Sequence, residues 1–132
     1  MRKILISLLV TALPVTAFAN GFLNNPRILK VNAISDTNFE VIDGPDSGPR
    51  AYWCAAALHV ENTLGRQQSR IYIAEGRGDS ITAPGRKAVQ FTTVPFGDVG
   101  PSYSVSIRQA GYNLGSGHAL RFCDDYSTTG IF

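Results

Sequence analysis

The sequence predicts an α+β domain in which one main helix packs on a twisted antiparallel sheet of about four to six strands. Three observations support this fold class. One segment has apolar residues at helical spacing between clear start and stop signals, several others alternate apolar and polar residues, and connections rich in Gly and Pro separate the alternating runs. Such connections suit an antiparallel meander better than the long crossovers of a parallel sheet.

Two short strands are expected before the helix, at residues 27–35 and 38–44. Both are rich in apolar and β-branched residues, and a polar turn at residues 35–38 joins them. The next stretch, residues 43–49, reads DGPDSGP and is typical of a turn that ends a strand.

The main helix is expected at residues 51–64. Ser47 and Gly48 can cap its start, Pro49 suits the first helical position, and Gly65 suits the residue just past its end. One stripe of the helical wheel is apolar and should lie on the sheet. It consists of Trp53, Ala56, Ala57, Val60 and Leu64.

After the helix the sequence alternates with a period of two. This pattern predicts strands at residues 69–76, 87–94 and 102–109, and a last strand at residues 118–123. The stretch from residue 76 to residue 86 is then the loop between two adjacent strands.

The first 19 residues have the pattern of a secretory signal peptide. Two basic residues precede an apolar stretch that is shorter than a membrane span, and an A-x-A site ends at Ala19. We therefore predict a signal peptide at residues 1–19 and a single small exported α+β domain at residues 20–132, either periplasmic or secreted.

The charge of the chain gives no support for a nucleic-acid partner. The chain has 12 Lys and Arg against 10 Asp and Glu, and two of the basic residues, Arg2 and Lys3, leave with the signal peptide, so the mature domain is neutral. No later segment is apolar for long enough to suggest a membrane span after cleavage. The expected partner is an unknown protein or a component of the cell envelope.

Cys54 and Cys123 are the two cysteines of the chain. Because exported proteins fold in oxidising compartments, we expect a structural disulfide between them that closes a loop of about 70 residues. One observation opposes this pairing. In a strand over residues 118–123, Cys123 would point away from the face that carries His118.

The alternative is a papain-like cysteine hydrolase or transferase, with Cys54 as the nucleophile and His118 as the base. Cys54 lies about one turn into the helix, where the helix dipole stabilises a thiolate. His59 is unsuitable as the base because it lies about 140° around the helix from Cys54. It also lies about 120° from the apolar stripe, so we expect it to be exposed or half-exposed.

The sequence lacks the rest of such an active site. The Gly- or Ser-rich surroundings of the nucleophile and the polar residue that orients the base are missing near Cys54 and His118. We therefore assign no catalytic residue and favour a protein that is not an enzyme.

Residues 76–80 read GRGDS and fall in the predicted loop. Arg77, Gly78 and Asp79 match the tripeptide that animal integrins recognise, so an adhesion ligand is a further alternative. The simpler explanation is a solvated loop, because Gly, Arg and Asp also gather in turns for conformational reasons.

No cofactor or metal site is expected. His59 and His118 are far apart and no cysteine pair has metal-ligand spacing. The phosphate-loop, nucleophile-elbow and dinucleotide motifs are also missing. The sequence thus predicts a non-catalytic binding module, inhibitor-like or accessory to the cell envelope.

Overall fold

The computed structural model describes residues 28–45, 48–66, 68–95, 100–102 and 104–126. The predicted signal peptide lies outside these described residues. One antiparallel sheet has the strand order β1-β2-β4-β3-β5. Its strands are β1 (Val31–Ala33), β2 (Asn38–Ile42), β3 (Arg70–Asp79), β4 (Lys87–Thr92) and β5 (Asn113–Gly115). The predicted α+β fold is confirmed, and the sheet has five strands.

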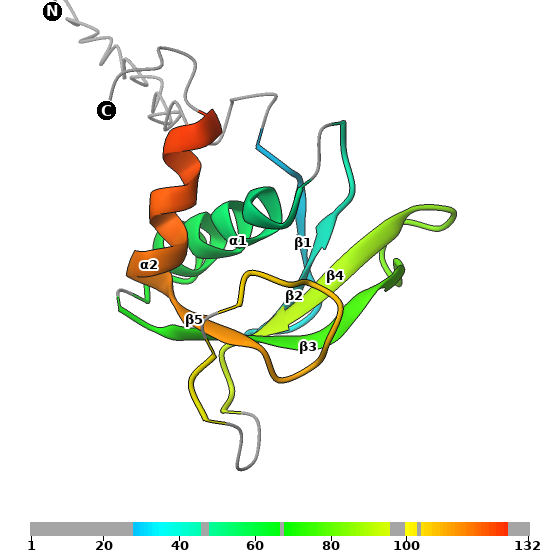
Figure 1. Cartoon of the computed structure of the whole chain (residues 1–132). Helices are drawn as coiled ribbons and strands as arrows, with labels where there is room; N and C mark the ends of the chain where they lie inside the picture. Colours follow the sequence, from blue (N-terminus) through cyan, green and yellow to red (C-terminus); the bar gives the residue numbers. More distant parts are fainter. Residues whose placement is uncertain (1–27, 46–47, 67, 96–99, 103, 127–132) are drawn as a thin grey trace, which may run out of the picture.

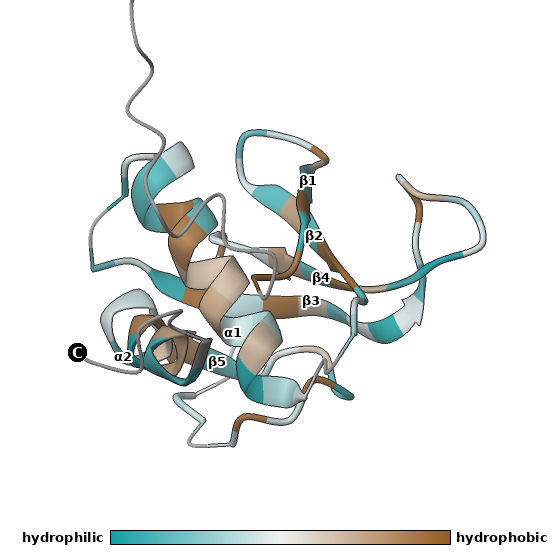
Figure 2. Ribbon diagram, turned by 90° about the horizontal axis from the view of Figure 1, so that it is seen from above, coloured by the Kyte–Doolittle hydropathy of each residue, from teal (hydrophilic) through white to brown (hydrophobic). Residues whose placement is uncertain are grey.

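Two helical units cover one face of the sheet, where the sequence predicts one main helix. They are α1 (Pro49–Leu58), which continues as the π-helical turn η1 (His59–Thr63), and α2 (Ser116–Leu120), which continues as the 3-10 turn η2 (Arg121–Tyr126). Figure 1 shows α1 lying across the sheet and α2 standing beside it. Figure 2 shows the same layers from above, with α2 crosswise to α1.

The main helix forms where its start and stop signals predict. Pro49 occupies its first turn, Gly48 before it is extended, and Gly65 follows η1 with a φ of 65°. Every residue from Ala51 to Leu58 is buried, because the sheet covers one side of α1 and the α2–η2 unit covers another. The helix is therefore central to the core.

An aromatic group joins α1 to the sheet. The Trp53 ring meets Phe91 of β4 edge-on, with 5.1 Å between ring centroids, and Phe91 stacks on Phe39 of β2. The indole Nε1 of Trp53 donates a hydrogen bond of 2.9 Å to the carbonyl of Val105. Trp53 thus fixes the helix on the sheet and also holds the chain segment that precedes β5.

The strand predicted at residues 102–109 is wrong for the part that the structure describes, since residues 104–108 are irregular. The backbone N–H groups of Ser106 and Arg108 donate to the hydroxyl groups of Ser104 and Ser106. These local bonds compete with a strand ladder. The segment still runs beside β3, where Arg77 donates its N–H to the carbonyl of Ile107 at 2.8 Å.

The strand predicted at residues 118–123 is also wrong, because this segment is helical. Ser116, Ala119 and Cys123 are buried and follow one another at spacings of three and four, which is the period of a helix. Over so short a run, alternation and helical spacing are hard to tell apart. Packing against α1 selects the helix.

Among the described residues, no helix is both long and apolar enough to cross a membrane.

Candidate functional site

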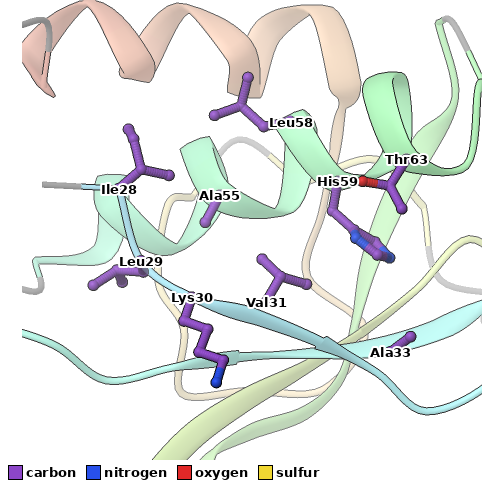
Figure 3. Close-up of a pocket in the computed structure, with 9 residues that line it drawn as sticks. All are labelled: Ile28, Leu29, Lys30, Val31, Ala33, Ala55, Leu58, His59 and Thr63. Atoms are coloured by element: carbon purple, nitrogen blue, oxygen red, sulfur yellow. The ribbon is translucent and has the colours of Figure 1, made fainter. Parts of the chain in front are cut away.

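A groove of about 510 Å³ separates the edge strand β1 from the helix formed by α1 and η1. Residues 28–31 and Ala33 line one side of it, as Figure 3 shows. The helix lines the other side with Ala55, Leu58, His59 and Thr63. We call this space the β1–α1 groove. Its volume is within the range of pockets that bind small ligands, which is about 300–1,000 Å³.

The helical side of the groove comes from a single face. Ala55, Leu58, His59 and Thr63 are separated by steps of three, one and four residues, so their side chains lie near one another. The helix changes type inside this face, where Leu64 donates its N–H to the carbonyl of His59 at 3.0 Å. Such π-helical turns are rare and occur frequently at functional sites.

His59 is the buried polar residue of the groove. Its residue surface is only 8% exposed, and its ring packs on Phe39 with 4.4 Å between centroids. The prediction of an exposed or half-exposed His59 is therefore wrong, because Phe39 of β2 packs against the ring on the side of the helix away from the predicted apolar stripe. No pattern in the sequence predicts the contact that buries His59.

The Nε2 atom of His59 is buried and has no hydrogen-bond partner among the described residues. Figure 3 shows the imidazole reaching from the helix toward β1. Burial lowers the pKa of His59, so the ring is neutral at pH 7. A buried polar atom without a hydrogen-bond partner destabilises the folded protein by about 1–3 kcal/mol. A ligand that forms a hydrogen bond with Nε2 would regain part of this free energy.

The lining of the groove suits binding. The polar residues among its described lining are Lys30, His59 and Thr63, and neither a carboxylate nor a thiol lies there. Apolar walls with a few polar groups are typical of ligand sites.

The structure joins Cys54 to Cys123, and so confirms the expected disulfide. Their Cα atoms are 4.9 Å apart, and both residues are buried. His118 lies on the exposed side of α2, where its ring contacts Phe122 at 5.6 Å between centroids. Cys54 could act as a nucleophile only in a form of the protein in which this disulfide is reduced.

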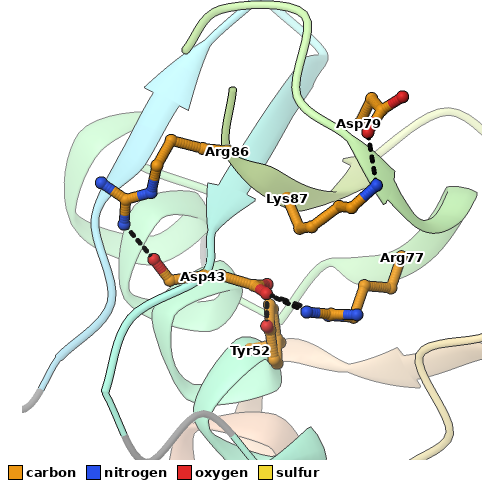
Figure 4. A network of polar contacts seen from close by, with 6 residues as sticks. All are labelled: Asp43, Tyr52, Arg77, Asp79, Arg86 and Lys87. Atoms are coloured by element: carbon orange, nitrogen blue, oxygen red, sulfur yellow. Dashed lines mark hydrogen bonds and ion pairs between the residues drawn. The ribbon is translucent and has the colours of Figure 1, made fainter. Parts of the chain in front are cut away.

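The tripeptide at residues 77–79 lies at the end of strand β3 and not in the predicted loop. Arg77 binds the carboxylate of Asp43, with 3.0 Å between its Nε and Oδ2, and Tyr52 also donates to this carboxylate. Figure 4 shows this network together with the ion pair between Asp79 and Lys87. The adhesion role stays a prediction, and it would require the Arg77 side chain to leave Asp43.

Cations exceed carboxylates in this network, because Arg77, Arg86 and Lys87 face only Asp43 and Asp79. Burial raises the pKa of Asp43, but the hydrogen bonds from Arg77 and Tyr52 and the charges of Arg77 and Arg86 outweigh it, so the pKa lies below its usual value. The guanidinium of Arg86 also donates to the Asp43 carbonyl. The network therefore ties the start of α1 to β3 and to the turn before β4.

No group of three or more metal-ligating side chains occurs among the residues that the structure describes. The fold and the groove together define a disulfide-bonded α+β domain with a pocket between an edge strand and a helix. No family model, no curated protein and no solved structure matches this chain.

Proposed function

We propose that this protein is an exported binding module that works without covalent chemistry, and that the β1–α1 groove is its ligand site. The observation that carries this proposal is His59, a residue of the mostly apolar groove lining whose buried Nε2 has no hydrogen-bond partner among the described residues.

The ligand group that fits this site is apolar and carries one hydroxyl. A neutral imidazole nitrogen is either a donor or an acceptor, depending on the tautomer, and a hydroxyl can complement both. The apolar walls favour the rest of such a group through burial of apolar surface. The one charged residue of the described lining is Lys30, which is exposed at the edge of the groove.

The test is a chemical-shift titration of the mature domain with 4-methylphenol and with its hydroxyl-free match, p-xylene. We expect 4-methylphenol to bind more tightly, and its shifts to concentrate on the backbone amides of β1 and η1. The reason is that only the phenol can pair with Nε2 of His59.

A blocked groove supplies the control. Thr63 is exposed at the edge of the groove, so Thr63→Trp should fill the entrance and abolish the shifts without disturbing the core. Asn62 is exposed next to it but does not line the groove, and Asn62→Trp should bind as the wild type does. Shifts that are absent, or that survive in Thr63→Trp, would refute the proposal.

A further inference from the structure

Strand β1 is an edge of the sheet, and half of its backbone groups face away from β2. Ile34 donates its N–H to Asn38, and Ile42 donates its N–H to Lys30, each at 2.9 Å. In an antiparallel pair the residues that bond to the neighbouring strand alternate. Val31 and Ala33, which lie opposite Val41 and Phe39, therefore direct their N–H and C=O groups outward.

These outward groups have no hydrogen-bond partner among the described residues. An exposed row of unpaired N–H and C=O groups is a template for another strand. Because the side chains of Val31 and Ala33 also line the β1–α1 groove, the open backbone edge and the groove belong to one surface.

A small apolar molecule would use the groove but would leave the open edge unpaired. An extended peptide would use both, because its backbone would pair with β1 while alternate side chains point toward the groove. Lys30 is exposed at the same edge and adds a positive charge that favours an acidic neighbour in such a peptide.

We propose that the ligand is an extended segment of another protein that adds to β1 as an additional strand and inserts a hydroxyl-bearing side chain, Ser, Thr or Tyr, toward His59. This inference rests on the proposed function, since it assigns a ligand class to the same groove. The backbone bonds supply affinity for any extended segment, and the groove with His59 selects the inserted side chain.

The experiment uses a phage library of random dodecapeptides, selected on the oxidised mature domain. A selected peptide is synthesised, and its binding is measured by calorimetry to the wild type, Thr63→Trp, Asn62→Trp and Ala33→Pro. Proline at residue 33 removes an outward N–H and leaves the bonds to β2 in place, so an edge strand tolerates it. We expect about a tenfold loss of affinity in Ala33→Pro, a loss in Thr63→Trp, and none in Asn62→Trp.

A second measurement does not depend on any variant of the domain. Each peptide bond of the selected peptide is N-methylated in turn, and binding to the wild type should be lost at every second position, as a strand ladder requires. If Ala33→Pro fails to fold, this scan still tests the inference, and binding that is kept at every methylated position would refute it.

The outcomes separate the two proposals. Suppose that 4-methylphenol binds but the selection yields no peptide. The strand-addition inference alone would then be overturned. The same holds if a selected peptide binds Ala33→Pro as tightly as the wild type and its N-methyl scan shows no alternating loss of affinity. Loss of 4-methylphenol binding as well would overturn both. If sedimentation shows that the domain forms a dimer through β1, the partner strand is a second copy of this chain. That result would also overturn the inference.

Discussion

Glu40 is a charged residue with no exposed surface, and the loop between β3 and β4 explains how the fold tolerates it. Its carboxylate accepts the backbone N–H of Ile81 at 3.2 Å and that of Thr82 at 2.8 Å, together with the hydroxyl groups of Ser80 and Thr82. Burial raises the pKa of Glu40, but these hydrogen bonds outweigh it and hold the pKa below its usual 4.5. Glu40 thus fastens the loop to the sheet.

At the scale of this residue we expect Glu40→Gln to reduce the free energy of unfolding by about 2 kcal/mol at pH 7, because the amide leaves a buried donor without a partner. A folded-state pKa below the unfolded value gives stability that is present above pH 4.5 and is lost as the pH falls through the folded pKa. The difference between wild type and Glu40→Gln in urea unfolding should therefore shrink from pH 6 to pH 3. Glu75→Gln, on the exposed side of β3, should leave the free energy of unfolding at pH 7 unchanged.

His59 gives a second prediction at the same scale. Burial lowers its pKa below the usual 6.5, so the unfolded chain binds a proton that the folded protein does not. The stability that depends on the neutral ring is complete above pH 6.5 and declines as the pH falls, by up to about 1.4 kcal/mol per pH unit until the folded pKa is reached. Urea unfolding of the wild type and His59→Gln should reveal this slope as a difference between them. Parallel curves from pH 7 to pH 4 would contradict it.

At the scale of the elements, Gly76 decides how the irregular segment before β5 meets strand β3. A Cβ atom at residue 76 would lie 2.3 Å from the carbonyl oxygen of Arg108, which is backbone and cannot turn away. At Gly78, two residues along the same strand, the nearest atom would be at an ordinary 3.6 Å.

We expect Gly76→Ala to destabilise the domain by about 2 kcal/mol or more, because the segment that Trp53 anchors at Val105 must move. Gly78→Ala should be neutral within about 1 kcal/mol. Thermal unfolding of both variants measures the difference, and amide hydrogen exchange should show the loss of protection at Arg77, whose N–H bonds to Ile107. Equal stability of the two variants would mean that β3 and the segment separate without penalty.

The elements that could be predicted are those with local signals. The helix from Pro49 has its own start and stop residues, and the hairpin strands β3 and β4 have clear alternation, so their existence follows from the sequence. The α2 helix has only a short apolar run, and its type depends on packing against α1.

The site was harder to predict than the elements. His59 is buried because Phe39 of β2 packs on its ring, and this contact joins parts of the chain about 20 residues apart. A helical wheel describes the helix alone, so it cannot show which sides neighbouring strands will cover. The disulfide could be predicted because it depends on cysteine count and compartment and not on the type of the last element.

At the scale of the whole molecule, the disulfide connects the two helical units on one face of the sheet. Cys54 lies in α1 and Cys123 lies in η2, 69 residues apart in sequence. Cross-linking a loop of this size lowers the entropy of the unfolded chain and stabilises the fold by about 4 kcal/mol. This is a large share of the net stability of a small domain, which is about 5–15 kcal/mol.

We therefore expect no free thiol in the protein isolated without reductant and denatured before reaction with a thiol reagent. The double variant Cys54→Ala with Cys123→Ala should unfold at lower urea and lose about 4 kcal/mol, while 4-methylphenol still binds, because neither cysteine lines the groove. Two free thiols in the isolated protein would contradict the disulfide. Rapid alkylation of Cys54 at neutral pH, slowed in His118→Ala, would then favour the hydrolase hypothesis over a binding module, because an activated thiolate needs a nearby base and a structural thiol does not.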